Sequence, residues 1–421
     1  MIDAADFLMA LDLDSFVRLF WFGLIFEVPR FVLGAMAVAA WIAVEFFYDR
    51  EEPKADDDLS VCVIVSAYNS EASIDYTIAS LNEQTTPCEI IAVDDGSTDG
   101  TRRALRDLKR DGRVDVFIPL ARRSGKSAAV NAAISHTDAD IICIVDSDTS
   151  FDRDAIEELT APFSDPDVGA VSGNIGLRNE DVNLLTMVQS IEYLMGISLG
   201  RRVLSMLGIL TIASGAFGAF RREAVISVGA QDIDVGEDAD LTLKLRRAGW
   251  TVAFAPDAWA LTDGPETLLG LTKQRLRWDR GIVTHWMRKY RENFDPRSAG
   301  FTLSDAMASF EVLLFQPLLN LMFFGYLIWL VWLVGEFAWV IIGATLIGYA
   351  VMTSLTFVLA GVVSRRKGYW HLVPFVPVFI ALNLFYLRPL RFVAYFDELA
   401  FRRSYRDSYV PQNVLDQAEV F

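Results

Sequence analysis

The sequence predicts an α/β domain with a mostly parallel sheet, flanked by α-helical segments that are long enough to cross a membrane. Two observations predict this arrangement. Apolar strand-like runs alternate with helical stretches in the first half of the chain. Apolar residues also gather near both ends of the 421 residues, which are 52% hydrophobic and 22% charged, against roughly 45–50% and 25% in an average soluble chain. This apolar content excludes a disordered chain.

The N-terminal part contains two apolar segments. Residues 31–47 form a run of about the minimum length for a bilayer span. Residues 16–26 are shorter and are cut off by the polar and proline-containing stretch 27–30. We interpret residues 16–26 as an interfacial or re-entrant helix, with a second short span as the alternative. A removed signal peptide is not expected, because no basic region precedes these segments and no small-residue cleavage site follows them.

Three further apolar runs follow near the C-terminus, at residues 312–334, 338–363 and 371–387. Each is about long enough to cross a bilayer. The third is short and contains Pro374 and Pro377, so it is either a span or a broken or re-entrant segment. We therefore expect two or three C-terminal spans.

Basic residues indicate the orientation of these spans. The connection 364–371 contains three basic residues and the turn 335–337 contains none, which places the former on the cytoplasmic side. The same orientation keeps residues 51–303 in the cytoplasm. The arginines of the tail 388–421 also favour the cytoplasm, whereas three complete spans would put that tail outside. The sequence leaves this conflict open.

Between the apolar ends the chain reads as repeated strand–helix–strand units, which imply a mostly parallel sheet. Three of the predicted strands are continuous apolar runs, as expected for strands that are covered on both faces. Ligands of such sheets bind beyond the carboxyl ends of the strands. The predicted strands are 61–66, 89–93, 114–118 and 141–145, and the helices between them are 70–83, 98–109 and 127–135.

Carboxylates follow two of these strands. Asp94 and Asp95 precede a glycine after the second strand, and Asp146 and Asp148 follow the fourth. Taken alone, the first pair is typical of a turn or helix cap, whereas alternate carboxylates can bind one hard cation. Two carboxylate clusters at one sheet edge repel each other, so a cation or hydrogen-bond donors are expected there.

Two later motifs have both a structural and a chemical interpretation. The basic stretch 122–127, which includes Lys126, is not a Walker phosphate loop because position 120 is leucine, but it opens a helix and suits phosphates. Glu237 and Asp238 begin another helix, where acidic residues also serve as caps.

A basic amphipathic stretch covers residues 274–291. Such a helix beside a membrane domain normally lies at the lipid interface. That interpretation accounts for the basic stripe but not for the cluster of Gln274, Arg277 and Trp278 at its start.

The net charge of −17 argues against binding nucleic acid through phosphate attraction. The acidic surplus fits either a high-salt cytosol or a GC-rich genome. The three cysteines stand far apart, so neither a disulfide framework nor a cysteine metal site is expected.

The motifs Asp94-Asp95-Gly96, Asp146-Ser147-Asp148, Glu237-Asp238 and Gln274-x-x-Arg277-Trp278, in this order and between apolar ends, resemble those of the family 2 glycosyltransferases with a GT-A fold. The resemblance is to their membrane-integrated, processive branch, which includes cellulose, hyaluronan, poly-N-acetylglucosamine and chitin-oligosaccharide synthases. It implies a GT-A catalytic domain, a transmembrane domain and amphipathic interface helices.

The resemblance also implies a role for each motif residue. Asp238 looks like the catalytic base, and Glu237 and Arg277 belong to the catalytic group. The metal, Mg²⁺ or Mn²⁺, is expected on Asp148 and Asp146. The donor nucleotide is expected on Tyr68, Asn69, Asp94, Asp95, Lys126, Asp146 and Gln274, and the acceptor on Trp278, Gly215 and Phe217.

The implied function is an inverting β-glycosyltransferase (a hexosyltransferase) that moves a sugar from a UDP-sugar to the growing end of a polysaccharide. UDP-glucose and UDP-N-acetylglucosamine are the favoured donors, and the family suggests a processive reaction coupled to export. The alternative is a single transfer to a lipid acceptor, either a polyprenyl phosphate or a diacylglycerol. We expect a multi-pass protein of the plasma or inner membrane with a cytoplasmic catalytic domain, in contact with the bilayer and with no nucleic acid.

The expected division of the chain follows from these features. It comprises N-terminal interfacial and transmembrane helices (1–50), the catalytic domain (51–267), amphipathic interface helices (268–305), C-terminal transmembrane helices (306–390) and a polar tail (391–421).

Overall fold

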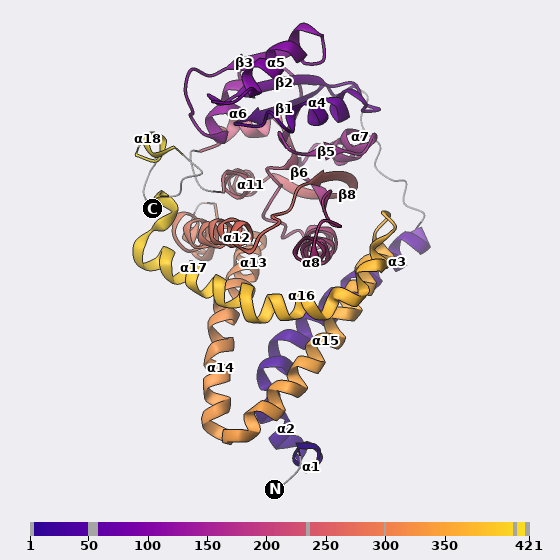
Figure 1. Cartoon of the computed structure of the whole chain (residues 1–421), viewed down its shortest axis with the longest axis vertical. Helices are drawn as coiled ribbons and strands as arrows, with labels where there is room; N and C mark the ends of the chain where they lie inside the picture. Colours follow the sequence, from indigo (N-terminus) through magenta and orange to yellow (C-terminus); the bar gives the residue numbers. More distant parts are fainter. Residues whose placement is uncertain (1–3, 49–57, 233–235, 299, 407–410, 417–421) are drawn as a thin grey trace.

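The parallel strands expected from the sequence form one half of an eight-stranded sheet. The computed structural model describes residues 4–48, 58–232, 236–298, 300–406 and 411–416 (Figure 1). The four predicted strands are present and pair in parallel, in the order β3-β2-β1-β4. Their bounds are β1 Val61–Ala67, β2 Glu89–Asp94, β3 Val116–Pro119 and β4 Ile141–Asp146.

The second half of the sheet is mixed. Strand β7 pairs antiparallel with both β4 and β6, β6 pairs in parallel with β8, and the short β5 closes the far edge. The full order is β3-β2-β1-β4-β7-β6-β8-β5. The added strands are β5 Ser150–Phe151, β6 Val168–Leu177, β7 Phe217–Arg221 and β8 Thr251–Thr262.

Alternation along β1 shows how the sheet is covered on both faces. Val63 and Val65 belong to one buried cluster, and Cys62 and Ile64 belong to another. All four side chains are fully buried, which explains why the strand reads as a continuous apolar run. The helices of the sheet domain are α4 Ile74–Asn82, α5 Thr101–Arg110, α6 Lys126–Ile134, α7 Ala155–Thr160, α8 Leu184–Tyr193, α9 Arg201–Met206, α10 Arg222–Ser227 and α11 Glu237–Arg247.

The N-terminal helices differ from the two separate segments that the sequence suggested. After α1 (Ala4–Met9), the elements α2 Leu13–Phe22, η1 Gly23–Glu27 and α3 Val28–Tyr48 follow one another without a break. The π-helical turn η1, in which the Val28 N–H bonds to the Gly23 carbonyl, loosens the helix just before Pro29, where a proline ring otherwise clashes. Glu27 is accommodated because its carboxylate accepts hydrogen bonds from Tyr349 and Arg388.

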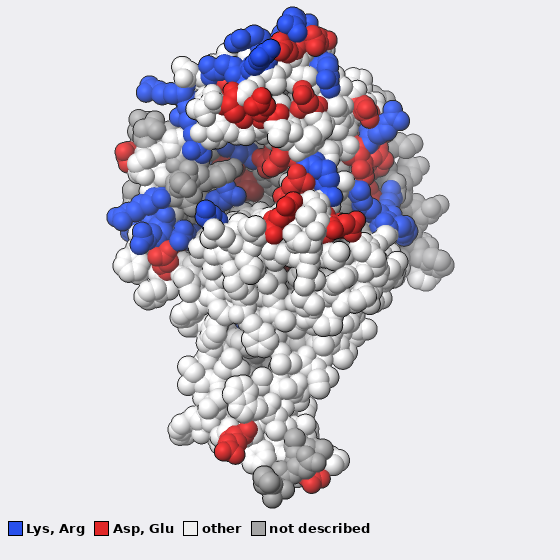
Figure 2. Space-filling model, viewed as in Figure 1, with Lys and Arg blue, Asp and Glu red and all other residues white. Residues whose placement is uncertain are grey.

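A helical hairpin follows the sheet domain. It descends through α13 Leu303–Leu313, η6 Leu314–Leu318 and α14 Leu319–Val334, turns at η7 Gly335–Phe337 and returns as α15 Ala338–Val363. Figure 1 shows α14 and α15 meeting at the foot of the molecule, with α2 and α3 beside α15. Figure 2 shows charged side chains gathered on the sheet domain and the helices beneath it, whereas the lower part of this face is mostly uncharged.

The last long helical segment runs across the others. It comprises η8 Tyr369–Phe375, α16 Val376–Leu382, η9 Asn383–Leu387 and α17 Arg388–Phe401. Three segments of the described chain are long and apolar enough to cross a membrane, and this is one of them, with Leu13–Ala43 and Leu303–Val363. Figure 1 shows α16 and α17 lying between the sheet domain and the hairpin, and α18 Gln412–Leu415 lying beside the sheet domain.

Candidate functional site

Register within the sheet brings the two carboxylate motifs to one edge. Ala67 of β1 pairs with Asp94 of β2, and Ser66 pairs with Asp146 of β4. Both motifs therefore begin where three neighbouring parallel strands end, which is the usual binding edge of such sheets. Figure 2 shows the molecular surface hollowed where the sheet domain meets the helices below, with basic and acidic side chains around the hollow.

Asp94 is turned into the protein. Its side chain is fully buried, and it accepts hydrogen bonds from the Ser97 N–H at 2.9 Å and from Arg102 Nε at 2.5 Å. These contacts hold the turn after β2. The sequence grouped Asp94 with the nucleotide-binding residues, whereas in the structure its carboxylate is committed to the turn.

Asp95 joins this turn to the basic loop. Its carboxylate accepts hydrogen bonds from the Ser124 and Gly125 N–H groups at 2.6 and 2.8 Å. Burial raises the pKa of Asp95, although both N–H groups act in the opposite direction. Gly96 has a φ of 71°, and a Cβ there would lie 2.4 Å from the backbone of Arg122 and Arg123, so the two loops approach more closely than a side chain allows.

Tyr68 and Asn69 lie beside these loops. The guanidinium of Arg123 lies 4.2 Å from the centre of the Tyr68 ring. Asn69 adopts a φ of 52°, its N–H donates to Ser97 Oγ at 3.0 Å, and its side-chain oxygen accepts from the Thr98 N–H at 2.9 Å. Both predicted nucleotide residues are therefore held at the edge where β1 and β2 end.

Lys126 brings three motifs together. Its ammonium group lies 2.5 Å from Asp146 Oδ1, donates to the Gly215 carbonyl oxygen at 2.8 Å and lies 3.6 Å from Glu237 Oε1. Burial raises the pKa of Glu237, and the nearby Lys126 charge lowers it. A single cation thus links the end of β4, the loop before β7 and the start of α11.

Asp238 occupies the first turn of α11. Its carboxylate accepts hydrogen bonds from the Ala239 N–H at 2.8 Å and from the Gly215 N–H at 3.2 Å. A Cβ at Gly215 would lie 3.1 Å from Lys126 Nζ and 3.3 Å from Asp238 Cβ. The glycine therefore lets both side chains approach the same backbone segment.

Phe217 does not share the surface of this site. Its side chain is fully buried in β7 and its ring centre lies 5.1 Å from that of Phe151. The sequence placed Phe217 with the acceptor, but the ring belongs to the core, because β7 is an inner strand covered on both faces.

Asp148 is held by contacts that the sequence did not predict. Its carbonyl oxygen accepts hydrogen bonds from Arg178 Nη2 at 2.9 Å and from the Tyr76 hydroxyl at 3.2 Å. Arg178 also donates to Asp263 at 2.6 Å. The surrounding protein raises the pKa of the Asp148 carboxyl, and the charge of Asp146 adds to this effect.

Arg178, Tyr76 and Asp263 could not be found from motifs, because each is an ordinary residue in the sequence. Pairing of β6 with β8 brings Arg178 and Asp263 together, and Tyr76 reaches them from α4. In that register Leu177 lies opposite Thr262, which places Arg178 beside Asp263. Another residue missed is Arg201 at the start of α9. Burial lowers its pKa, and the charge of Asp238 raises it.

The Gln-x-x-Arg-Trp cluster lies on α12 Leu268–Ile282, below the sheet domain (Figure 1). Gln274 Oε1 is buried and has no hydrogen-bond partner among the described residues. Arg275 forms an ion pair with Glu192 at 2.9 Å and lies over the Trp278 ring at 4.3 Å. The Trp278 side chain is 42% exposed, and Arg277 is partly exposed one residue before it.

The basic stripe of this segment faces carboxylates rather than only lipid. Arg280 pairs with Asp397 at 2.6 Å, and Arg288 pairs with the fully buried Glu398 at 2.8 Å. Farther along, Lys289 lies 2.6 Å from Asp240. These pairs fasten α12 and the following turn η4 Val283–Lys289 to α17 on one side and to α11 on the other.

Asp146 and Asp148 offer the oxygen ligands that a hard divalent cation prefers. Burial, and after it the charge of Asp146, raises the pKa of Asp148, and a cation beside both carboxylates would offset their repulsion. The donor set therefore fits Mg²⁺ or Mn²⁺, and Lys126 already supplies a positive charge on the Asp146 side.

Comparison with known proteins agrees with this arrangement. Residues 62–229 match the family model "Glycosyl transferase family 2". Poly-beta-1,6-N-acetyl-D-glucosamine synthase of Staphylococcus aureus strain COL is 32% identical over 255 residues, which cover 57% of this chain and 61% of that protein. The enzyme of the same name from Staphylococcus epidermidis is 31% identical over 257 residues, with the same coverage. The match thus spans about three fifths of these relatives' length.

A solved structure shares the fold. The mannosyltransferase PcManGT from Pyrobaculum calidifontis, in complex with GDP-Man and Mn²⁺, superposes with a TM-score of 0.59 at 22% identity, and the match covers 82% of this chain and 98% of that one. The predicted resemblance and the GT-A-type sheet are confirmed. Residues 62–229 therefore resemble a family 2 glycosyltransferase domain, and the chain is similar to the poly-N-acetylglucosamine synthases over about three fifths of their length.

Proposed function

We propose that this chain is a membrane-integrated, inverting β-glycosyltransferase that transfers a sugar from a UDP-sugar to the growing end of a polysaccharide. The observation that carries the proposal is the convergence on Lys126, which contacts Asp146, Gly215 and Glu237 within 3.6 Å. UDP-N-acetylglucosamine is the first donor to test, because two relatives at 31–32% identity are named for a polymer of that sugar.

The donor nucleotide fits the edge formed by the first two loops. The Tyr68 ring, partly exposed beside Arg123, offers an aromatic face to a pyrimidine base. Asp95 is fixed by two backbone N–H groups and is a candidate acceptor for ribose hydroxyls. Lys126, at the start of α6, is positioned to receive the negative charge of a diphosphate.

A divalent metal ion fits the same proposal. Asp148 and Asp146 would hold it, and a bound Mg²⁺ or Mn²⁺ supplies positive charge to the departing diphosphate. Arg178 and Tyr76 fix the backbone at Asp148, so the carboxylate is oriented before any ion arrives.

Asp238 is the proposed general base. In a single displacement, the acceptor hydroxyl oxygen bonds to the anomeric carbon while the bond from that carbon to the diphosphate oxygen breaks, and the hydroxyl proton passes to Asp238. UDP leaves with the bonding electron pair. The Gly215 N–H and the first turn of α11 orient the carboxylate, and such a base contributes roughly 10²–10⁴-fold to the rate.

The acceptor is assigned to α12. The partly exposed Trp278 ring can bind the apolar face of a sugar without selecting one pattern of hydroxyls. Gln274, whose Oε1 is buried and has no hydrogen-bond partner among the described residues, remains the proposed contact of this helix to the donor. An acceptor site that tolerates successive sugar units suits a processive reaction.

The helices favour a position in the plasma or inner membrane with the sheet domain in the cytoplasm. The basic connection 364–371 contacts that domain, since Arg365 lies 3.2 Å from Asp257 and Arg366 lies 3.6 Å from Asp152. Basic connections of this kind are typical of the cytoplasmic side. Export of the product through the helices belongs to the same proposal.

The direct test uses the full chain in membrane vesicles. Vesicles receive radiolabelled UDP-N-acetylglucosamine, UDP-glucose or GDP-mannose, each with Mg²⁺, Mn²⁺ or a chelator, and the product is sized and extracted into organic solvent. We expect metal-dependent incorporation from a UDP-sugar into aqueous or insoluble polymer. Product of one sugar in the organic phase would instead establish transfer to a lipid, and incorporation only from GDP-mannose would overturn the donor assignment.

A further inference from the structure

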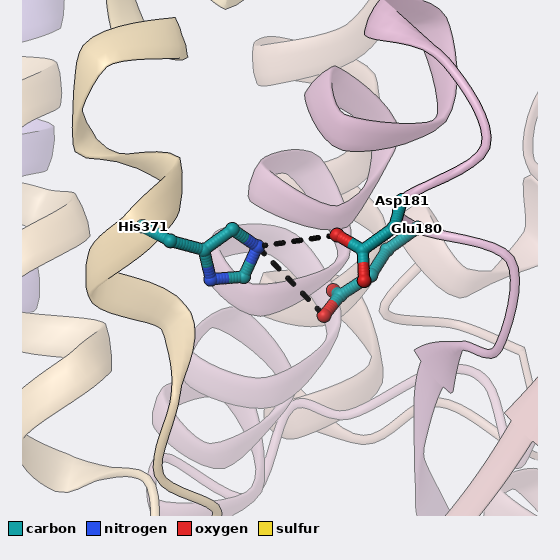
Figure 3. A group of neighbouring side chains, drawn as sticks. All are labelled: Glu180, Asp181 and His371. Atoms are coloured by element: carbon teal, nitrogen blue, oxygen red, sulfur yellow. Dashed lines mark ion pairs between the residues drawn. The ribbon is translucent and has the colours of Figure 1, made fainter.

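A second group of metal-ligating side chains lies apart from the proposed catalytic residues. Glu180 and Asp181 follow β6, in the loop before α8, and His371 belongs to η8 after the hairpin. Figure 3 shows the His371 ring pointing toward both carboxylates across the space between these segments. The ligand atoms all lie within 4.8 Å of one another.

The backbone contact of His371 decides which ring nitrogen faces the two carboxylates. Nδ1 lies 2.6 Å from the Gly368 carbonyl oxygen, and because a carbonyl only accepts, Nδ1 carries the hydrogen in the neutral ring. Nε2 then presents a lone pair to the oxygens of Glu180 and Asp181. A proton on Nε2 would make these contacts ion pairs, and a metal ion can take the place of that proton between the three atoms. A backbone carbonyl on the other ring nitrogen is typical of metal-binding histidines.

The distances also favour an ion rather than direct contacts. His371 Nε2 lies 3.6 Å from Asp181 Oδ1 and 4.0 Å from Glu180 Oε1, beyond the usual range of a hydrogen bond. A tetrahedral ion with bonds of about 2.0–2.2 Å separates its ligand atoms by roughly 3.4 Å. Small side-chain movements would therefore complete the coordination.

Contacts outside the group hold the ligands in place. The second carboxylate oxygen of Glu180 accepts a hydrogen bond from Ser190 Oγ at 2.6 Å, which leaves Oε1 directed at His371. The ion pairs of Arg365 and Arg366 with the sheet domain already dock the segment that precedes His371. Binding of an ion therefore does not have to bring the two segments together, which favours affinity.

We propose that Glu180, Asp181 and His371 form a binding site for a divalent transition-metal ion of the Zn²⁺ or Co²⁺ type, separate from the catalytic metal. One imidazole with two carboxylates suits such ions better than Mg²⁺, which prefers an all-oxygen shell. The side chains of His371 and Asp181 are 44% and 79% exposed, so solvent can enter and water can fill the remaining coordination positions.

The ion would fasten the sheet domain to the helices. Glu180 lies two residues after Arg178, which holds the backbone of Asp148, and His371 begins the segment that leads into α16. A bound ion would therefore link the loop after β6, near Asp148, to η8 and α16. Neither the nucleotide nor the sugar takes part in this link.

The test measures metal binding rather than turnover. The full chain, purified in detergent without a polyhistidine tag and saturated with Mg²⁺, is titrated with Zn²⁺ by calorimetry and with Co²⁺ by visible absorption. We expect the wild-type chain to bind one more equivalent of Zn²⁺ than His371→Gln. The affinity of the variant for that equivalent should fall roughly 100-fold or more, below the range of the titration. The double variant Glu180→Gln/Asp181→Asn keeps the side-chain shapes and should lose the same equivalent, which guards against a folding defect in one variant.

His136→Gln is the matched control. Its Nδ1 also lies 2.8 Å from a backbone carbonyl, that of Ala132, but His136 lies in the turn just after α6 and not in this group, so the variant should bind as the wild type does. Equal stoichiometry in wild type and His371→Gln would overturn the proposal, because it would mean an adventitious ion only or a proton alone between these groups.

Discussion

Lys126 and Asp146 form an ion pair at 2.5 Å, so the chain itself places a positive charge beside one of the two proposed metal ligands. The same ammonium group donates to the Gly215 carbonyl oxygen. We expect Lys126→Met to raise the KM for the UDP-sugar, because charge-assisted contacts of this kind contribute about 1.5–3 kcal/mol, or roughly 10- to 100-fold. Lys109→Met, at the exposed end of α5, is the control, and an unchanged KM in Lys126→Met would remove Lys126 from the donor site.

Asp238→Asn should abolish turnover while leaving UDP binding nearly intact. The amide cannot take the acceptor proton, and the loss should reach roughly 10²–10⁴-fold in kcat. Radiolabel incorporation measures the rate, and calorimetry measures UDP affinity. Asp75→Asn is the matched control, because Asp75 is also an acid in the first turn of a helix, on the exposed side of α4. Retained turnover in Asp238→Asn would refute its assignment as the base.

Gly96→Ala should weaken nucleotide binding and lower the thermal stability. The added Cβ would meet the backbone of Arg122 and Arg123 at 2.4 Å and force the two loops apart. Gly112→Ala separates this clash from backbone strain, because Gly112 has a similar φ of 73° but nothing within 4 Å of the added atom. We expect backbone strain in Gly112→Ala to lower the free energy of unfolding by about 1 kcal/mol or less. The UDP affinity of that variant should not change. Equal losses of UDP affinity and stability in Gly96→Ala and Gly112→Ala would show that the close contact between the two loops does not matter.

Asp148→Asn should raise the concentration of Mn²⁺ needed for half-maximal incorporation. The substitution removes one anionic ligand from the proposed pair and leaves only Asp146, which Lys126 already neutralises in part. The measurement is a Mn²⁺ titration of incorporation at saturating donor. The control is Asp99→Asn, whose carboxylate accepts hydrogen bonds within the loop before α5; a matching shift there would speak against a specific metal ligand.

Asp279 should make stability depend on pH. Burial raises the pKa of its carboxyl to about 6, while Arg391 and Arg275 act in the opposite direction. The folded state thus favours the protonated carboxyl. The contribution of this group to the free energy of unfolding is therefore complete below about pH 4 and is lost as the pH rises through about 6. Asp279→Asn does not titrate and so avoids this loss. Between pH 4 and 7 its free energy of unfolding should rise relative to that of the wild type by up to about 3 kcal/mol.

Thermal unfolding in detergent across that pH range measures the difference. Asp107→Asn, a surface acid on α5 whose side chain is 42% exposed, should follow the wild-type curve. A parallel course of the Asp279→Asn and wild-type curves would show that Asp279 does not titrate in this window.

Much of the sheet could be predicted because its strands are buried on both faces. The run through Val63 and Ile64 has no polar interruption, and the carboxylates at Asp94 and Asp146 mark where two strands end. Arg178 could not be predicted, because its partners Tyr76 and Asp263 lie 102 and 85 residues away. The pairing of β6 with β8 brings Asp263 to Arg178, and the position of α4 beside the sheet brings Tyr76 there.

The course of the last long helical segment, from η8 to α17, could not be predicted from the sequence either. Residues 371–387 have the length and apolar character of a span, which composition alone cannot distinguish from a helix that lies across others. Its course is fixed by specific partners: Asp397 with Arg280, and Glu398 with Arg288. Both pairs join α17 to the segment formed by α12 and η4.

The course of α16 and α17 also bears on how the two ends of the molecule are arranged. Helix α1 lies at the foot of the hairpin and α18 lies beside the sheet domain (Figure 1). If α3, α14 and α15 are the crossings, their number is odd, and the two ends face different compartments. A reporter fused after α18 would then share its compartment with the donor substrate, whereas one fused before α1 would lie on the opposite side of the membrane, where a protease applied from that side would reach it.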